Sequence, residues 1–432
     1  MRTTGAAPWL AALILFAALV GVVVTTTPWQ PFGAEDAQVA AAEPDRDFSA
    51  GEQAAAHSYR GDVRPPAYAN LVVSIGIAVL LGVTPLGARL VVAAARPLGT
   101  GWVWQVLLGG LALLLVVRLA TLPFSAWVEA VRRDYGLSTR DWGGWVADVA
   151  RSFGLQAAGT LVAVTALVAL ARVLPRWWWA PAAAGGALLV VVLSYAYPLL
   201  VEPVFNEFRP MDDGALRTSV LEMARDEGVE VEEVLVADAS RRTTTLNAYV
   251  SGFGATHRVV VYDNLLEQAP DSEVQQVVAH ELGHTVENDV RDGTLVGALA
   301  AATGVCLLAG VLSWRALLDR AGADGAGDPR VLALVLAVVA VLGLAASPGE
   351  NLISRRVETR ADVHALDVTG DPETFVRMQH RLGVTALSDP DPPPAVFGMF
   401  ASHPTKPQRI ALARTWAELN GEPVPRGLTG AG

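Results

Sequence analysis

The fold is decided by residues 271–313, DSEVQQVVAHELGHTVENDVRDGTLVGALAAATGVCLLAGVLS. Their first part contains a His-Glu-x-x-His motif, in which His280 and His284 are four residues apart. Residues at this spacing share one face of a helix, so both imidazoles can bind one metal ion. Glu281 follows the first histidine and can take a proton from a metal-activated water. Residues 292–313 are then long and apolar enough to cross a bilayer as a helix.

Six other apolar runs of similar length occur in the 432-residue chain. Charged residues make up 17% of it, below the roughly 25% of soluble domains. The seven expected spans lie near 9–27, 70–95, 101–121, 153–174, 180–202, 292–313 and 330–348. The first run has two interpretations, a signal peptide and a retained span. We favour a retained span, because only one basic residue, Arg2, precedes the run and no A-x-A cleavage site closes it.

Composition excludes several classes of function. A net charge of −11 argues against a nucleic-acid partner. The single cysteine, Cys306, lies in an apolar run and excludes both an intrachain disulfide and a multi-thiolate metal site. Lys406 is the only lysine. Arginines flank the two sides of the expected spans equally, so the positive-inside rule does not fix the orientation.

We therefore predict an α-helical polytopic membrane protein of about seven transmembrane helices with a mostly helical polar domain carrying a small β-hairpin or sheet. The expected parts are a first span and acidic loop (1–69), spans two to five (70–202), the motif-bearing domain (203–291), spans six and seven (292–348), the rest of the polar domain (349–421) and a flexible tail (422–432). Within the polar domain we expect a helix at 214–227, strands at 231–237, 243–250 and 258–262, a turn at 251–254 and, after Pro270, a helix opened by a Ser272–Gln275 capping box. Residues 28–69 are expected to be a poorly ordered polar loop.

A catalytic zinc needs a third protein ligand and one open position. The extended motif with a third histidine is absent, because position 290 is valine. Downstream, Glu358 and Asp362 form an E-x-x-x-D pair on a predicted helix. Glu358 could be the third ligand, and Asp362 could accept a hydrogen bond from a ligand histidine and so orient it. The alternatives are a charged helix face, in which these acids pair with Arg355, and ligation by His364, which lies about half a turn away.

Two further polar clusters flank the motif in the sequence. Asn247, Ala248 and Tyr249 lie on a predicted strand whose exposed edge could pair with an extended peptide; the alternative is an ordinary hairpin strand. His403 and Arg409 come from the C-terminal segment and could stabilise an oxyanion near the metal; the alternative is that they are connecting-loop residues.

The chain resembles the CAAX prenyl endopeptidase type 1 group of integral-membrane zinc proteases, which are relatives of the HtpX heat-shock protease. Besides the histidine motif, the similar stretches are 122–125 (LPFS), 135–139 (YGLST), 203–206 (PVFN), 247–249 (NAY), 262–263 (YD), 354–362 (SRRVETRAD) and 402–404 (SHP) with Arg409. The similarity covers about residues 65–415 in the right order. Ser138 stands where the group has asparagine, and the first 65 residues have no counterpart.

The resemblance implies a zinc-dependent membrane endopeptidase with one Zn²⁺ ion and seven transmembrane helices around a water-filled chamber. It implies that Glu358 is the third ligand, that Glu281 is the general base, and that Asn247, His403 and Arg409 line the substrate cleft. It also implies a catalytic domain that faces the cytoplasm. An arginine-rich, lysine-poor chain of this kind is typical of a bacterial membrane protein, whose peptide or protein substrate need not carry a lipid.

Three alternatives remain beside CAAX-type processing. One is quality control of membrane proteins in the manner of HtpX. A second is a site-2-type protease, which the acidic residues around His280 disfavour because that group places its motif inside a span. The third is a non-catalytic membrane protein with a structural zinc, which would need a fourth cysteine or histidine ligand. The ligand set also accepts Co²⁺ or Mn²⁺.

Overall fold

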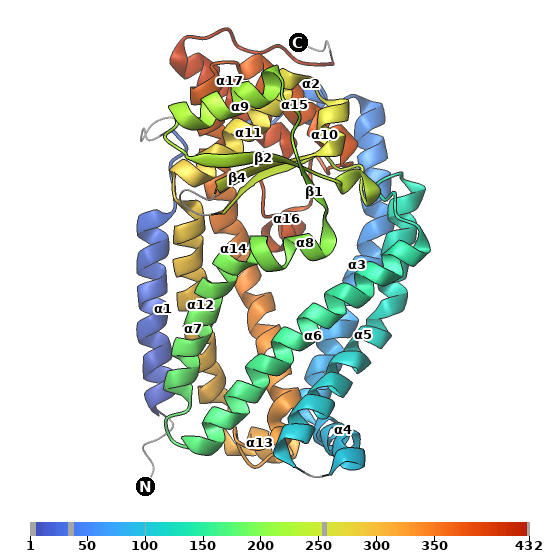
Figure 1. Cartoon of the computed structure of the whole chain (residues 1–432), viewed down its shortest axis with the longest axis vertical. Helices are drawn as coiled ribbons and strands as arrows, with labels where there is room; N and C mark the ends of the chain where they lie inside the picture. The colour runs from blue at the N-terminus through green and yellow to red at the C-terminus, as the bar shows by residue number, and fades with distance from the viewer. Residues whose placement is uncertain (1–5, 33–38, 100, 253–256, 430–432) are drawn as a thin grey trace.

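The long helices and the polar domain form the two halves of the molecule (Figure 1). The computed structural model describes residues 6–32, 39–99, 101–252 and 257–429. Within these residues seven helical segments are long and apolar enough to cross a membrane, which confirms the predicted number. They are Ala6–Thr26 (α1), Ala50–Val83 (α3), Trp102–Asp134 (α5), Trp142–Val173 (α6), Trp179–Phe205 (α7, Trp179–Leu200, with α8, Glu202–Phe205), Asp289–Val311 (α12) and Pro329–Thr369 (η4, Pro329–Val331, with α14, Leu332–Thr369).

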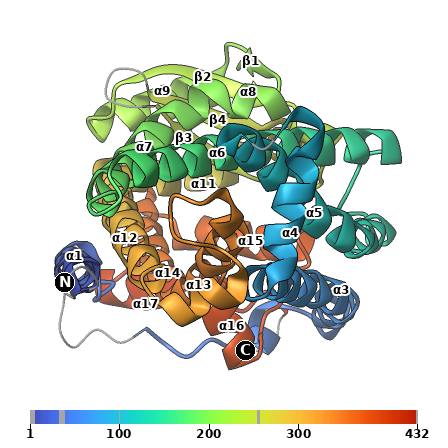
Figure 2. The same cartoon turned by 90° about the horizontal axis from the view of Figure 1, so that it is seen from below.

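Apolar side chains on the outer faces of these helices remain exposed, as a lipid-facing surface requires. Helix α1 packs on α12, where the indole of Trp9 lies directly against Gly310. At the end far from the polar domain lie α4 (Pro85–Ala95), η1 (Arg96–Leu98) and α13 (Arg315–Ala321). Figure 2 shows the long helices arranged around α13 when the molecule is seen from that end.

Helix α3 differs from the prediction at both of its ends. It begins at Ala50, inside the expected polar loop, because Ser49 and Glu52 form a capping box whose two bonds are 3.3 and 2.8 Å. It ends at Val83, so the expected span at 70–95 is two helices rather than one. The break occurs at Thr84, whose hydroxyl caps α4 ahead of Pro85. The polar first half of α3 therefore extends beyond the apolar segment to the polar domain.

The polar domain contains a four-stranded sheet in the order β1-β2-β4-β3. Its strands are β1 (Phe208–Pro210), β2 (Val231–Ala237), β3 (Ala248–Ser251) and β4 (His257–Tyr262). The predicted β3–β4 hairpin is present and antiparallel, whereas β2 runs parallel to β4. Its turn falls partly on Phe253 and Gly254, which lie outside the described residues. Strand β3 lies at the edge of the sheet and pairs only with β4 among the strands that the structure describes.

The strand predicted at 243–250 is wrong in its first half. Residues 243–247 do not belong to β3, because their threonine hydroxyls hydrogen-bond elsewhere. Thr243 donates to the carbonyl of Leu137 at 3.3 Å, and Thr244 donates to the carbonyl of Gly136 at 3.1 Å. These bonds attach the segment to the loop between α5 and α6.

The motif helix is α11 (Asp271–Val286), and it lies in the middle of the domain core. Val274, Val278 and Leu282 on its apolar face are fully buried. Around it lie the sheet and the helices α9 (Ala215–Asp226), α10 (Asp263–Gln268), α14, α15 (Pro372–Thr385) and α17 (Lys406–Asn420); α16 (Pro394–Phe400) packs on α14 nearby. The predicted capping box is wrong: no side chain caps α11, and Gln275 donates instead to Ser219 of α9 at 2.8 Å.

The N-terminal connection and the chain end meet on α17. Helix α2 (Pro44–Asp47) places Asp47 against Arg414, in a buried ion pair with one bond of 2.8 Å. Arg414 also donates to the carbonyl of Pro425 at 3.0 Å. Thr429 donates to the carbonyl of Arg46 at 3.0 Å. The expected tail is therefore hydrogen bonded as far as the structure describes it.

Candidate metal centre

His280, His284 and Glu358 meet at the junction of two helices. One ligand atom from each lies within 4.8 Å of the other two. The first two come from α11 and the third from α14, which pack closely because position 283 is glycine. A Cβ at Gly283 would lie only 2.9 Å from the ring of His364. A larger residue there would push the two helices apart and separate the carboxylate from the imidazoles.

The distances within this cluster fit a single ion. Glu358 Oε2 lies 3.3 Å from His280 Nε2, and Glu358 Oε1 lies 3.7 Å from His284 Nε2. Bonds of about 2.0–2.1 Å in a tetrahedral site place ligand atoms roughly 3.3–3.4 Å apart. Glu358 Oε2 is also buried without a hydrogen-bond partner among the described residues. An unpaired carboxylate oxygen facing two imidazole nitrogens is what a shared cation would satisfy.

Each ligand histidine has a carboxylate behind it. Asp362 Oδ1 lies 3.0 Å from Nδ1 of His280 and is fully buried. Asp289 Oδ2 lies 2.8 Å from Nδ1 of His284. A carboxylate that accepts the Nδ1 proton fixes the tautomer in which Nε2 faces the ion. Both acids therefore aim an imidazole at the metal position.

Arginines hold both of these carboxylates. Arg409 of α17 makes a two-pronged pair with Asp362, and its Nε–Oδ2 bond is 2.7 Å. Arg360 bonds to Asp289 and lies 3.1 Å from Glu287. The guanidinium of Arg409 is thus engaged behind His280, a placement that suits positioning of the histidine.

Glu281 and His403 line the cavity beside the cluster. Burial raises the pKa of the Glu281 carboxyl, which brings it closer to the range of a general base. His403 Nε2 lies 3.3 Å from Glu358, and its Nδ1 lies 2.9 Å from the hydroxyl of Ser402. Partial desolvation at the cavity wall lowers the pKa of His403, which favours its neutral ring. Its exposed fraction of 57% leaves it free to meet a substrate.

The cavity has a volume of about 1000 Å³ and joins both halves of the molecule. One wall comes from α3, including Tyr68 and Leu71, and another from Asn247, Ala248 and Tyr249. The carbonyl of Asn247 accepts from the N–H of Tyr262 on β4 at 3.0 Å. Because pairing alternates along an antiparallel strand, the backbone groups of Ala248 then point to the free edge. This edge can pair with an extended peptide.

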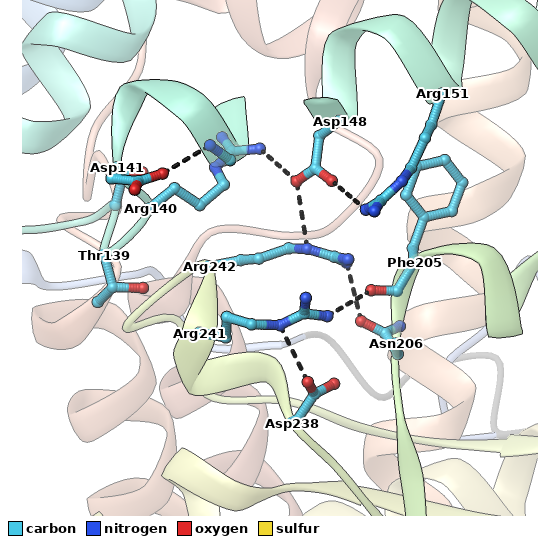
Figure 3. Close-up of polar contacts among 12 residues, drawn as sticks. Thr139, Arg140, Asp141, Asp148, Arg151, Phe205, Asn206, Asp238, Arg241 and Arg242 are labelled. Atoms are coloured by element: carbon cyan, nitrogen blue, oxygen red, sulfur yellow. Dashed lines mark hydrogen bonds and ion pairs between the residues drawn. The ribbon is translucent and has the colours of Figure 1, made fainter. Parts of the chain in front are cut away.

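A polar network fixes the loop beside this strand (Figure 3). Asp148 of α6 lies between Arg140 at 3.3 Å and Arg242 at 3.2 Å, and Arg242 also donates to Asn206 at 3.0 Å. Ser138 pairs with Thr243 in a short β-bridge. The network therefore ties the α5–α6 loop to the segment that leads into β3.

Ser138, where the resembling group has asparagine, has a partner of its own. Its hydroxyl donates to Glu129 at 2.6 Å. Glu129 is buried in α5 and also accepts from Arg140 at 2.8 Å.

The structure brings the predicted ligand residues together with Glu281, Asp362, His403, Arg409 and the 247–249 strand at one cavity. The rival ligand His364 packs against Gly283 but does not join the cluster, because its Nε2 lies 3.2 Å from Glu227. Asp289 was not among the predicted site residues. It reaches His284 because Asn288 is left-handed, with φ of 59°, and turns the chain back toward the end of α11.

Two family models and several known proteins match this chain. A family model described as peptidase family M48 matches residues 210–417, and one described as the CAAX prenyl protease N-terminal domain of five membrane helices matches residues 67–207. A protease HtpX homolog from Herminiimonas arsenicoxydans is 32% identical over 46% of this chain and 70% of its own length. The chain belongs to peptidase family M48.

This family assignment implies a bound metal. Other relatives are the uncharacterized metalloprotease YhfN of Bacillus subtilis, at 32% identity, and a CAAX prenyl protease 1 homolog of Arabidopsis thaliana, at 30%. Each match covers 51% of this chain and 52% of the relative, so the chain spans about half the length of the first curated relatives it matches. The crystal structure of S. mikatae Ste24p superposes with a TM-score of 0.74 at 18% identity, covering 94% of this chain and 98% of that one. That likeness confirms the fold.

Proposed function

We propose that this M48 member is a zinc-dependent membrane endopeptidase. The observation that carries the proposal is the His280, His284 and Glu358 cluster, with Glu281 beside it in a cavity bounded by an edge strand. Three protein ligands leave one coordination position open, as in catalytic rather than structural zinc sites. With one carboxylate and two imidazoles, zinc suits the site best. When bound, the metal supplies a Lewis acid that polarises the scissile carbonyl and activates water.

The protein groups have separate tasks in this proposal. The free edge of β3 holds the peptide extended by backbone hydrogen bonds. The carboxylate of Glu281 removes a proton from the attacking water and then delivers it to the leaving amine. His403 donates a hydrogen bond to the developing oxyanion. Asp362 with Arg409, and Asp289 with Arg360, keep the two imidazoles oriented throughout.

The substrate we propose is a membrane-associated peptide or protein segment. The cavity wall formed by α3 belongs to a helix that also spans the membrane, so a chain at the bilayer surface can reach the metal. The names of the Arabidopsis relative and of the HtpX homolog suggest two candidates, processing of a CAAX tail and general proteolysis of membrane proteins. The catalytic half would lie in the cytoplasm of a bacterial cell.

The test is cleavage by purified protein in detergent, with metal content determined. Glu281→Ala is the test variant, and Glu267→Gln, an exposed acid on α10, is the matched control. We expect one zinc in all three proteins, wild-type activity in Glu267→Gln, and a loss of at least about a hundredfold in Glu281→Ala. A chelator should abolish cleavage, and added Zn²⁺ should restore it. Equal activity in Glu281→Ala would refute the assigned base.

A farnesylated peptide and its unprenylated twin distinguish the two substrate candidates. A preference of wild type for the farnesylated peptide supports tail processing, and equal rates support general proteolysis. Zinc binding without cleavage of any peptide would instead favour a non-catalytic zinc protein.

A further inference from the structure

The only lysine of the chain, Lys406, lines the same cavity as the metal cluster. It is the first residue of α17, three positions before Arg409, so the two side chains lie on one face of the helix. A cation at the first turn is unfavourable, because this end of a helix already carries partial positive charge. The position of Lys406 therefore has no explanation in the stability of α17.

Packing directs the lysine side chain toward α15. A Cβ at Gly383 would lie 3.2 Å from Cγ of Lys406 and 3.0 Å from the ring of Phe48, so the absence of a side chain there makes room for the lysine stem. The ammonium donates to Oε1 of Gln379 at 3.1 Å. No carboxylate within 4.0 Å pairs with Lys406 among the residues that the structure describes. The aliphatic part of the lysine side chain is therefore packed, and its ammonium has one uncharged hydrogen-bond partner, Gln379.

Gln379 has an unsatisfied donor. Its side chain is fully buried, and its Nε2 has no hydrogen-bond partner within the described part of the chain. The orientation of the amide follows from the lysine, because an ammonium can only donate and so requires Oε1. A buried N–H left unpaired costs about 1–3 kcal/mol. Two donors, an ammonium and an amide, thus lie side by side and both lack an anionic acceptor.

The nearby acids are already engaged. Asp362 is paired with Arg409, and Glu358 belongs to the metal cluster. Asp389 on the cavity wall is paired with Arg64 at 2.6 Å. None of these three acids is therefore free to accept from Lys406 and Gln379.

We propose that Lys406 and Gln379 form a subsite that binds a carboxylate of the peptide substrate. The proposal rests on the proposed function, since the ligand is the peptide held in that cavity. The carboxylate accepts from both donors, which satisfies the buried amide and neutralises the ammonium. Two sources have this chemistry, the α-carboxylate at a peptide C-terminus and an Asp or Glu side chain.

The test is a binding measurement that does not depend on turnover. Fluorescence anisotropy of labelled pentapeptides is followed on zinc-loaded, full-length Glu281→Gln protein. Four probes are used, with a free or amidated C-terminus and with an internal Glu or Gln. We expect tighter binding, by about tenfold or more, for the probe that carries the recognised carboxylate. A difference between free acid and amide identifies the C-terminus, and a difference between Glu and Gln identifies the side chain.

Two further substitutions, each added to the Glu281→Gln protein, test whether Lys406 and Gln379 cause the preference for a carboxylate. Adding Lys406→Met should remove the preference while leaving binding of the neutral probes within about twofold, which also shows that the fold is intact. Adding Gln379→Glu should remove it too, because the new carboxylate would pair with the lysine internally. Equal binding of charged and neutral probes, or a preference that survives Lys406→Met, overturns the subsite.

Failure of the subsite and failure of the proposed function give different results. If wild type cleaves the probes without any preference for a carboxylate, the peptidase proposal stands and the subsite falls. If a lysine-dependent preference is measured but wild type cleaves nothing, the subsite stands and the peptidase proposal falls.

Discussion

At the scale of single residues, the carboxylates behind the histidines decide how well the metal is held. Asp289→Asn keeps the size of the side chain but can present an N–H to His284 Nδ1, which favours the wrong tautomer. We expect the zinc affinity to fall about 10–100-fold, as outer carboxylates generally contribute. Competition with a chromophoric chelator measures the affinity directly. Asp292→Asn, one turn further along α12 and outside the cluster, is the control. Equal affinity in Asp289→Asn and wild type would remove Asp289 from the site.

Lys406 predicts how stability depends on pH. Burial, and next the charge of Arg409, lower the pKa of Lys406 from 10.5 to about 7, while Asp362 and Glu358 oppose this shift. Between these pH values the unfolded chain binds more protons at this position, so the stability of wild type gains from rising pH. Lys406→Met should therefore raise the thermal midpoint most at pH 6 and least at pH 10.

The quantity to follow across pH is the difference in thermal unfolding midpoint between Lys406→Met and wild type. Both proteins are zinc-loaded and free of peptide. Other titrating groups contribute equally to both proteins and cancel. Lys406→Arg keeps the buried charge and should show no gain. A pH-independent difference would mean that Lys406 is charged equally in the folded and unfolded chains.

The ligand residues could be predicted from sequence because each depends on local periodicity. His280 and His284 share a helix face by spacing alone, and so do Glu358 and Asp362. Asp289 could not be found this way, because its approach to His284 depends on the left-handed turn at Asn288. The partnership of Lys406 with Gln379 depends on how α15 packs against α17, and no local pattern encodes that contact.

At the scale of elements, the edge strand makes a prediction about peptide backbones. The backbone N–H and C=O groups of Ala248 and Val250 point to the free edge of the sheet, whereas those of Tyr249 point toward β4. Only every second peptide residue can therefore bond to β3. A scan of N-methylated peptides should show alternating effects on affinity for Glu281→Gln protein. Methylation should weaken binding about three- to tenfold at the paired positions and have little effect between them. A uniform effect along the peptide would exclude strand addition.

Elements were predicted well where one pattern covers their whole length. The seven spans follow from apolar length, and the β3–β4 hairpin follows from alternation and glycine. Helix α3 was misjudged because its first half is polar and is stabilised by contacts distant in sequence. Arg64 pairs with Asp389, and Tyr59 packs on Tyr135. Residues 243–247 were misjudged for the same reason, since their hydrogen bonds go to the α5–α6 loop.

At the scale of the whole molecule, the positions of α13 and α17 relative to the long helices predict which residues a reagent outside the cell can label. Helix α13 and the end of α17 lie at opposite ends of the molecule (Figure 1). The native Cys306 is buried in α12, so wild type serves as the unlabelled control. In intact cells, a membrane-impermeant maleimide should label Asp319→Cys on α13 and should spare Glu418→Cys on α17. Labelling in the reverse pattern would place the catalytic half outside the cytoplasm.

Helix α14 passes without interruption from the bilayer to the metal, from Leu332 to Thr369, with Pro348 inside it. Proline removes one backbone bond and leaves a compliant point in a helix. Glu358 lies ten residues beyond, so a rotation of about 5° at Pro348 moves its carboxylate by roughly 1.3 Å, given a rise of about 1.5 Å per residue. The residues from Leu332 to Pro348 lie in the membrane-spanning part of the helix, so a change in their tilt is transmitted through Pro348 to Glu358. A span can meet a change in bilayer thickness by tilting, so we expect bilayer thickness to change the catalytic rate. Proteoliposomes of graded acyl length should show one optimum, and replacing Pro348 with alanine should flatten it.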